Sequence, residues 1–152
     1  MSVGEICNRE VVTIEKGATV AKAARLMRQF HVGSVVVVAD GEDSRRPVGI
    51  ITDRDLAIEI LAQEVPVETV TVGDVMGPEL LTAREEDGVW ETIMRMRAMG
   101  VRRLPVINRH GVLTGILTMD DLLQFIVGEL SDLVKLVRRE QKREEAIRHP
   151  EP

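Results

Sequence analysis

The chain has 152 residues, of which 44% are hydrophobic and 30% are charged, as expected for one globular domain or two small ones that share a core. Aromatic residues make up only 2% and the net charge is −5, which argues against both an aromatic platform for single-stranded nucleic acid and a broad basic surface. The single cysteine, Cys7, excludes an internal disulfide and a zinc site built from several cysteines.

The N-terminus and the longest apolar run bear on localisation. Residues 1–5 contain no basic region followed by an apolar segment, so we expect no secretory signal. The longest apolar stretch, 35–39, is far too short to cross a bilayer. We therefore expect a cytoplasmic protein with neither a membrane nor nucleic acid as a partner.

An internal repeat is the most informative feature of the sequence. Val-Gly-Glu-Ile at 3–6 reappears as Val-Gly-Asp-Val at 72–75, and Gly-Ile-Ile-Thr at 49–52 reappears as Gly-Ile-Leu-Thr at 115–118. The offset between the copies falls by three residues, which we assign to a longer polar turn at 41–46 in the first copy. The repeat predicts four segments: a first unit at 3–61, a linker at 62–71, a second unit at 72–127 and a charged helical tail at 128–152.

Each unit shows the same order of predicted elements. Apolar residues recur at helical spacing near 20–31 and near 89–100, and a β-branched run follows each helix, at 35–38 and 104–107. A second strand ends each unit, at 48–51 and 113–117, and a helix then opens at Thr52 or Thr118. The predicted fold class is therefore mixed α/β (α+β), with two strand–helix–strand–strand–helix units. We expect the units to pack through their sheets, because one unit cannot bury its apolar face alone.

A Gly-apolar-apolar-Thr-x-x-Asp motif marks both strand-to-helix junctions, at 49–55 and 115–121. Thr at a helix start with an acidic residue three positions later is typical of a capping box, which is a purely structural role. The same geometry also suits a ligand, because the carboxylate can accept hydrogen bonds from a ribose diol while the helix start attracts an anion. Both interpretations stay open, and they can coexist. The candidate residues are Thr52, Asp55, Thr118 and Asp121.

Arg102 and Arg103 precede a strand of the second unit. Their planar guanidinium groups could hold phosphate oxygens, although a solvated loop is the preferred interpretation for two adjacent arginines alone. The first unit has Gly33 and Ser34 at the matching positions, so the two units differ chemically there.

No assembled catalytic or metal site is apparent. The three histidines are scattered, and the acidic cluster 85–87 precedes a helix whose dipole it complements. Cys7 aligns with Met76 and is expected to fill the core. A nucleophile elbow and a phosphate-binding P-loop are both missing, so we expect neither a catalytic residue nor a bound metal.

The tail continues the apolar stripe of the last helix as far as Val137, after which charges of both signs alternate. A solvated helix supported by i,i+4 ion pairs is the preferred interpretation, and a dimer contact through the stripe is the alternative. The interleaved glutamates argue against nucleic-acid binding by the basic residues.

Taken together, the unit openers, the Val-Arg-Arg-Leu-Pro-Val strand at 101–106 and the doubled Gly-x-x-Thr-x-x-Asp motif resemble the cystathionine-β-synthase (CBS) domain family, as a tandem pair over about residues 3–127. The resemblance implies a pseudo-twofold pair of units that dimerises into a disc of four. It implies an adenosyl ligand in the clefts between units: AMP, ADP or ATP, sometimes S-adenosylmethionine or a dinucleotide.

The resemblance also assigns roles to residues. The Thr and Asp of each motif would hold the ribose, with phosphate contacts from the helix start and the partner unit's strand entrance. Since the contacts cross the cleft, the Asp55 site would face the arginines and the Asp121 site would face Gly33 and Ser34. The further candidates are Arg54, Arg102 and Arg103 for phosphate, and the backbone near Thr13 and Thr82 for the adenine edge.

The expected function is a stand-alone regulatory module that binds an adenine nucleotide, performs no chemistry and signals to an unknown downstream protein through ligand-dependent packing. An assembly module with empty clefts is the main alternative. A nucleotide hydrolase is disfavoured, because the sequence shows no base, nucleophile or metal ligands for it.

Overall fold

The computed structural model describes residues 1–149, apart from the side chain of Asp43. It divides into a first compact unit, Met1–Thr118, and a second one that begins at Met119. The prediction of a charged tail for residues 150–152 lies outside the described residues.

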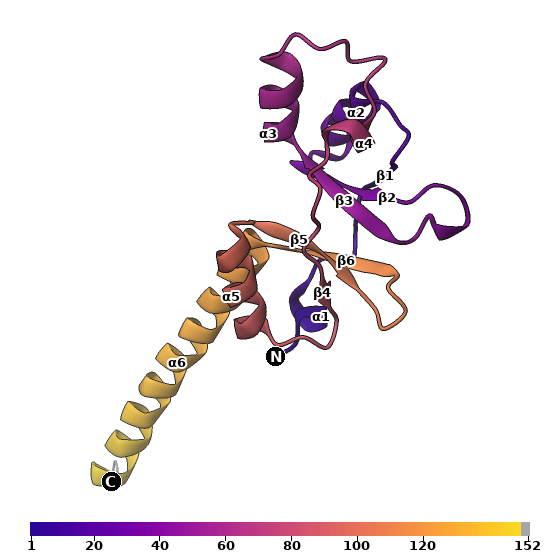
Figure 1. The fold of residues 1–152 in the computed structure, drawn as a ribbon. Helices are drawn as coiled ribbons and strands as arrows, with labels where there is room; N and C mark the ends of the chain where they lie inside the picture. The colour runs from indigo at the N-terminus through magenta and orange to yellow at the C-terminus, as the bar shows by residue number, and fades with distance from the viewer. Residues whose placement is uncertain (150–152) are drawn as a thin grey trace. The chain divides into compact units, whose positions relative to one another are not determined.

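The first compact unit contains two three-stranded sheets with the same topology (Figure 1). In each sheet the first two strands are parallel and the last two are antiparallel. The predicted mixed α/β (α+β) class with two repeated units is thereby confirmed. The strands of the first sheet are β1 (Thr13–Glu15), β2 (Ser34–Val38) and β3 (Pro47–Thr52), and those of the second are β4 (Ala83–Arg84), β5 (Arg103–Ile107) and β6 (Leu113–Thr118).

The repeat extends to the register of the strands. Ser34 pairs with Thr52 in the first sheet, and Arg103 pairs with Thr118 in the second. Each central strand also carries an irregularity at its end, between Val37 and Val38 and at the matching place in β5. Ser34 and Arg103 therefore occupy equivalent positions, each opposite the last residue of the neighbouring strand.

The two longest helices of the first compact unit, α2 (Val20–Phe30) and α5 (Val89–Met99), follow the first strand of each sheet. The hydroxyl of Thr19 caps α2 by accepting a hydrogen bond from the Lys22 N–H at 3.2 Å. Both helices end at a left-handed residue, His31 with φ 54° and Gly100 with φ 65°, a conformation that favours glycine.

Five shorter helical segments complete the repeats. The remaining α-helices are α1 (Val3–Ile6), α3 (Asp53–Asp55) and α4 (Val72–Val75). α3 continues directly into a π-helical segment, Leu56–Leu61, and the turn predicted at 41–46 contains a 3₁₀ helix, Gly41–Asp43.

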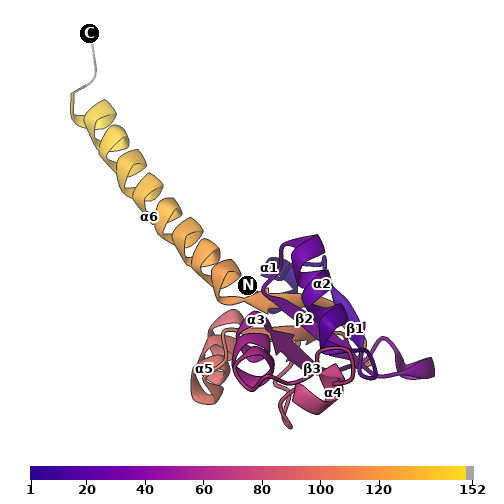
Figure 2. The same cartoon turned by 90° about the horizontal axis from the view of Figure 1, so that it is seen from above.

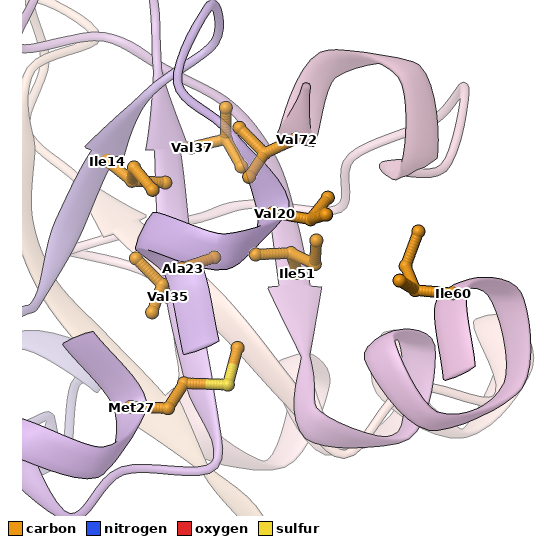
Figure 3. Packing of buried hydrophobic residues seen from close by; sticks show 9 residues of the cluster. All are labelled: Ile14, Val20, Ala23, Met27, Val35, Val37, Ile51, Ile60 and Val72. Atoms are coloured by element: carbon orange, nitrogen blue, oxygen red, sulfur yellow. The ribbon is translucent and has the colours of Figure 1, made fainter. Parts of the chain in front are cut away.

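The core of the first repeat is built from aliphatic residues (Figure 3). β2 is buried along its whole length, which explains why its sequence is a run of valines rather than an alternating pattern. One member of the cluster, Val72, comes from the second repeat. The cluster consists of Ile14, Val20, Ala23, Met27, Val35, Val37, Ile51, Ile60 and Val72.

The opening helix of each repeat packs against the sheet of the other repeat. α1 contacts β4 and β6, and the Gly4 N–H donates to the Glu85 carbonyl oxygen at 2.9 Å. In return, α4 contacts β3, and the Val72 N–H donates to the Ala18 carbonyl oxygen at 2.8 Å. The two repeats therefore share their cores and form one folding unit.

At both of these contacts, a sulfur-containing side chain packs against a glycine of the other repeat's sheet. A Cβ atom placed on Gly49 would lie 2.5 Å from Sδ of Met76, and one placed on Gly115 would lie 2.7 Å from Sγ of Cys7. The alignment of Cys7 with Met76 is thereby confirmed, since each side chain covers the equivalent glycine.

α6 (Met119–Arg148) is one continuous helix of 30 residues (Figure 2). Its first turn contains Asp120 and Asp121. Within residues 1–149, no helix combines the length and the apolar character needed to cross a membrane.

Candidate functional site

Thr52 and Asp55 lie where β3 passes into α3. The Asp55 N–H donates to Oγ1 of Thr52 at 3.1 Å, and the Thr52 N–H donates to Oδ2 of Asp55 at 2.9 Å. The structural interpretation of this motif, a capping box, is thus confirmed. The pair uses only one carboxylate oxygen, Oδ2, so Oδ1 of the half-buried Asp55 can accept a hydrogen bond from a ligand.

Arg103 reaches the start of α3 from the other repeat. A Cβ atom placed on Gly33 would lie 3.3 Å from Nη1 of Arg103 and 3.2 Å from Oδ2 of Asp53. The Gly33 carbonyl oxygen also accepts a hydrogen bond from the Asp53 N–H at 3.0 Å. A guanidinium group and the carboxylate of Asp53, the residue after Thr52, therefore converge over Gly33. A side chain at Gly33 would crowd both groups.

A cavity of about 350 Å³ lies beside Asp55, at the small end of the range for ligand pockets. Three carboxylates line it: Asp55, Glu59 and Asp74. The hydrogen bond from the backbone N–H of Thr71 lowers the pKa of Asp74 the most, and the Thr71 hydroxyl lowers it further, so Asp74 stays ionised at neutral pH. This wall suits hydrogen-bond donors and repels phosphate.

The other predicted phosphate residues are exposed. Arg54 is the middle residue of α3, and its N–H donates to Oδ1 of Asp53 at 2.8 Å. Arg102 precedes β5 and is exposed, whereas Arg103 is half-buried. Of the two adjacent arginines, the structure therefore brings Arg103 to the start of α3.

Thr13 and Thr82, predicted near the adenine edge, lie in different surroundings. The carbonyl oxygen of Thr82 accepts a hydrogen bond from Nη2 of Arg95 at 2.7 Å, which uses one of its two lone pairs. Thr13 begins β1 and lines a separate cavity of about 250 Å³, together with Arg9, Arg45 and Thr114.

Thr118 and Asp121 belong to the second motif. Thr118 is the last residue of β6, and Asp121 lies in the first turn of α6. Both are half-buried. Their assignment to a second ribose site stays a prediction.

Sequence reasoning did not single out Asp53 and Asp74. Asp53 has no counterpart in the second repeat, where Met119 stands at the matching position, so the repeat could not mark it. Asp74 belongs to a unit opener, and only the packing of α4 against the first repeat places it beside Asp55.

A family model described as the CBS domain matches residues 3–62 and again residues 72–128. The chain belongs to the CBS domain family. The resemblance that the motifs predicted is thus confirmed, including the tandem arrangement of two CBS domains.

Similar proteins support this assignment. An uncharacterized protein of Methanopyrus kandleri is 36% identical over 143 residues, which cover 92% of this chain and 71% of that protein. Among solved structures, a CBS domain protein of Pyrobaculum aerophilum complexed with AMP gives a TM-score of 0.76 at 25% identity, covering 87% of this chain and 99% of the other.

A third relative contains metal. The crystal structure of Hypoxic Response Protein I, with two coordinated zinc ions, gives a TM-score of 0.71 at 29% identity and covers 82% of this CBS chain and 98% of its own. In this chain, residues 1–149 hold no group of three or more His, Cys, Asp or Glu side chains placed to bind a metal ion.

Proposed function

We propose that this CBS-domain chain is a cytoplasmic regulatory module that binds an adenine nucleotide (AMP, ADP or ATP) at the start of α3 and catalyses no reaction. Asp55 and Thr52 hold the ribose, and Arg103 holds a phosphate. The approach of Arg103 to the start of α3, over Gly33 and next to the Thr52–Asp55 pair, is the observation that carries the proposal. The AMP complex of the P. aerophilum relative supports the choice of ligand.

The charge distribution around α3 favours one orientation of the nucleotide. The nucleoside carries the hydrogen-bond donors, namely the ribose hydroxyls and the adenine amino group, which match the acidic wall formed by Asp55, Glu59 and Asp74. The phosphate is drawn to Arg103, because a guanidinium group binds phosphate with two parallel hydrogen bonds. Arg54 and Arg102 supply further phosphate contacts from the surface.

A second site with Thr118 and Asp121 follows from the repeat, with the backbone near Thr13 and Thr82 at the adenine edges. This site is the weaker one for phosphate, since Gly33 and Ser34 replace the two arginines. Two chains form a homodimer that contains four CBS domains, and nucleotide binding changes how these domains pack. A downstream protein distinguishes the nucleotide-bound state from the nucleotide-free state.

Isothermal titration with AMP and ATP tests the proposal. Losing a hydrogen bond to a charged group costs about 1.5–3 kcal/mol, so Asp55→Ala should weaken binding roughly 10–150-fold. Asp121→Ala should have a smaller effect. Glu5→Ala, which removes the carboxylate of the α1 capping box, is the matched control and should leave the affinity unchanged. Equal losses from Asp55→Ala and Asp121→Ala would refute the difference between the two sites.

The capping box supports a second candidate, an assembly module in which Thr52 and Asp55 only start a helix. Thermal unfolding distinguishes the two functions, because a ligand at 100 times its dissociation constant adds about 2.7 kcal/mol of stability. The same measurement separates AMP, ADP and ATP from S-adenosylmethionine and dinucleotides. A midpoint that no adenosyl compound raises would favour the assembly module.

A further inference from the structure

α6 presents an apolar stripe over its first five turns. Eight residues between 119 and 137 fall within an arc of about 120° around the helix. Four of them, Leu123, Leu130, Leu133 and Val137, expose 50–60% of their surface. A contiguous apolar patch of this kind marks an interaction surface. The stripe consists of Met119, Leu123, Ile126, Val127, Leu130, Leu133, Val134 and Val137.

The centre of the stripe has the spacing of a coiled-coil seam. Six of its residues follow one another at alternating intervals of four and three, which is the pattern of two helices packed side by side. The next two seam positions are Glu140 and Glu144, so the apolar seam ends at Val137. Its 19 residues extend over about 28 Å. The seam consists of Met119, Leu123, Ile126, Leu130, Leu133 and Val137.

The seam residues alone fit either direction of pairing, but the charges favour one. In a parallel pair each residue lies level with the same residue of the other copy. The carboxylates of Glu140 and Glu144 would then face the same carboxylates across the seam and repel them. In an antiparallel pair the two apolar seams overlap fully, and Glu140 extends beyond the seam of the other copy. Antiparallel helix dipoles also attract each other, whereas parallel ones repel.

Charges beside the seam favour the antiparallel direction as well. Asp120 and Arg138 are 18 residues, or five turns, apart and lie on the same side of the stripe. Like sides face each other in an antiparallel pair, so Asp120 of each copy lies within two residues, or about 3 Å along the axis, of Arg138 of the other. This attraction occurs twice. On the other side of the stripe, the exposed Glu129 faces Glu129 of the other copy, which is a single repulsion.

We propose that two copies of this chain associate through the first five turns of α6, packed antiparallel. Leu123 then lies opposite Leu133 of the other copy, and Ile126 lies opposite Leu130. The contact involves neither Thr52 nor Asp55, so it forms with or without a nucleotide.

Disulfide trapping in the full chain tests both the contact and its direction. In a Cys7→Ser background, which removes the only native cysteine, Leu123→Cys and Leu133→Cys proteins are prepared separately and oxidised mildly, alone and mixed. We expect the mixture to form a 123–133 disulfide at least tenfold faster than either protein links to itself. Both positions are exposed, so the substitutions leave the fold intact.

The controls fix the meaning of each result. A matched pair on the polar side of α6, Gln124→Cys with Lys135→Cys, should cross-link no faster than background. Faster linking of Leu123→Cys to itself would show a parallel pair and overturn the proposal. Linking of the mixture at the rate of the polar pair would show that α6 does not associate.

Discussion

The residues Thr52 and Asp55 make the same reciprocal hydrogen bonds that Thr71 and Asp74 make at the start of α4. In both places a threonine hydroxyl accepts from a backbone N–H three residues later, and the carboxylate accepts from the threonine N–H. The cap therefore explains the local structure at each site but not the function. The neighbours differ, because only the start of α3 has Arg103 close by.

Replacing a capping threonine by alanine separates the two roles. Thr52→Ala and Thr19→Ala should each lower the free energy of unfolding by about 0.5–2 kcal/mol, since each removes a helix cap. Thr19 caps α2, away from Asp55 and Asp74, so only Thr52→Ala should also weaken AMP binding. Urea unfolding and calorimetric titration measure the two effects, and an equal loss of AMP affinity in Thr19→Ala would contradict a binding role for Thr52.

Arg9 and Glu85 form an ion pair that joins the first repeat to the second. The side-chain hydrogen bond from Arg9 lowers the pKa of Glu85 below its ordinary value of 4.5, and the same bond raises the pKa of Arg9. A carboxylate with a lowered pKa stabilises the fold above pH 4.5, and this contribution is lost as the pH falls further.

Glu85→Gln should therefore lower stability at pH 7 and flatten its decline below pH 4.5. Urea unfolding at pH 7 and pH 3 measures both effects. The exposed Glu91→Gln is the control and should decline as the wild type does. If Glu85→Gln loses as much stability on acidification as the wild type, the ion pair has no part in the pH dependence.

At the scale of elements, the packing of each sheet depends on a glycine that closely contacts a segment of the other repeat. A Cβ atom on Gly115 of β6 would lie 2.9 Å from the carbonyl oxygen of Asn8, in addition to its contact with Cys7. Asn8 and Ile116 exchange two backbone hydrogen bonds of 2.9 Å, which hold that carbonyl in place. The three atoms nearest to a Cβ on Gly49 all belong to the side chain of Met76, which can move.

Gly115→Ala should consequently destabilise the protein by about 1–3 kcal/mol, the usual cost of overpacking, and Gly49→Ala should cost less. Gly17→Ala is the control, since its nearest neighbour would be at an ordinary 3.6 Å. Urea unfolding gives all three values. A Gly115→Ala protein as stable as Gly17→Ala would show that Cys7 and Asn8, which follow α1, do not pack tightly on β6.

At the scale of the whole molecule, the repeat predicted the order of elements and the two sheets. It predicted them because valine runs, helical spacing and turn residues recur in both halves. It could not predict that α1 and α4 exchange sheets, because Val-Gly-Glu-Ile would pack equally well on either sheet. The contacts of α1 with β4 and β6 and of α4 with β3, with the hydrogen bonds from Gly4 to Glu85 and from Val72 to Ala18, establish the exchange.

The candidate site was predictable to a similar extent. The doubled motif predicted Thr52 and Asp55, and the unmatched arginines indicated that the two halves differ. The sequence could not distinguish Arg102 from Arg103, since the choice depends on which side chain the strand directs toward Gly33. Asp53 and Asp74 became apparent only through contacts between segments far apart in the chain.

A crystal structure of the chain grown with AMP, at 100 times the dissociation constant measured in solution, tests the central claim most directly. The account predicts ribose hydroxyls within hydrogen-bonding distance of Oδ1 of Asp55, and phosphate oxygens against the guanidinium group of Arg103. AMP bound away from both residues, or crystals with no AMP beside α3, would contradict it.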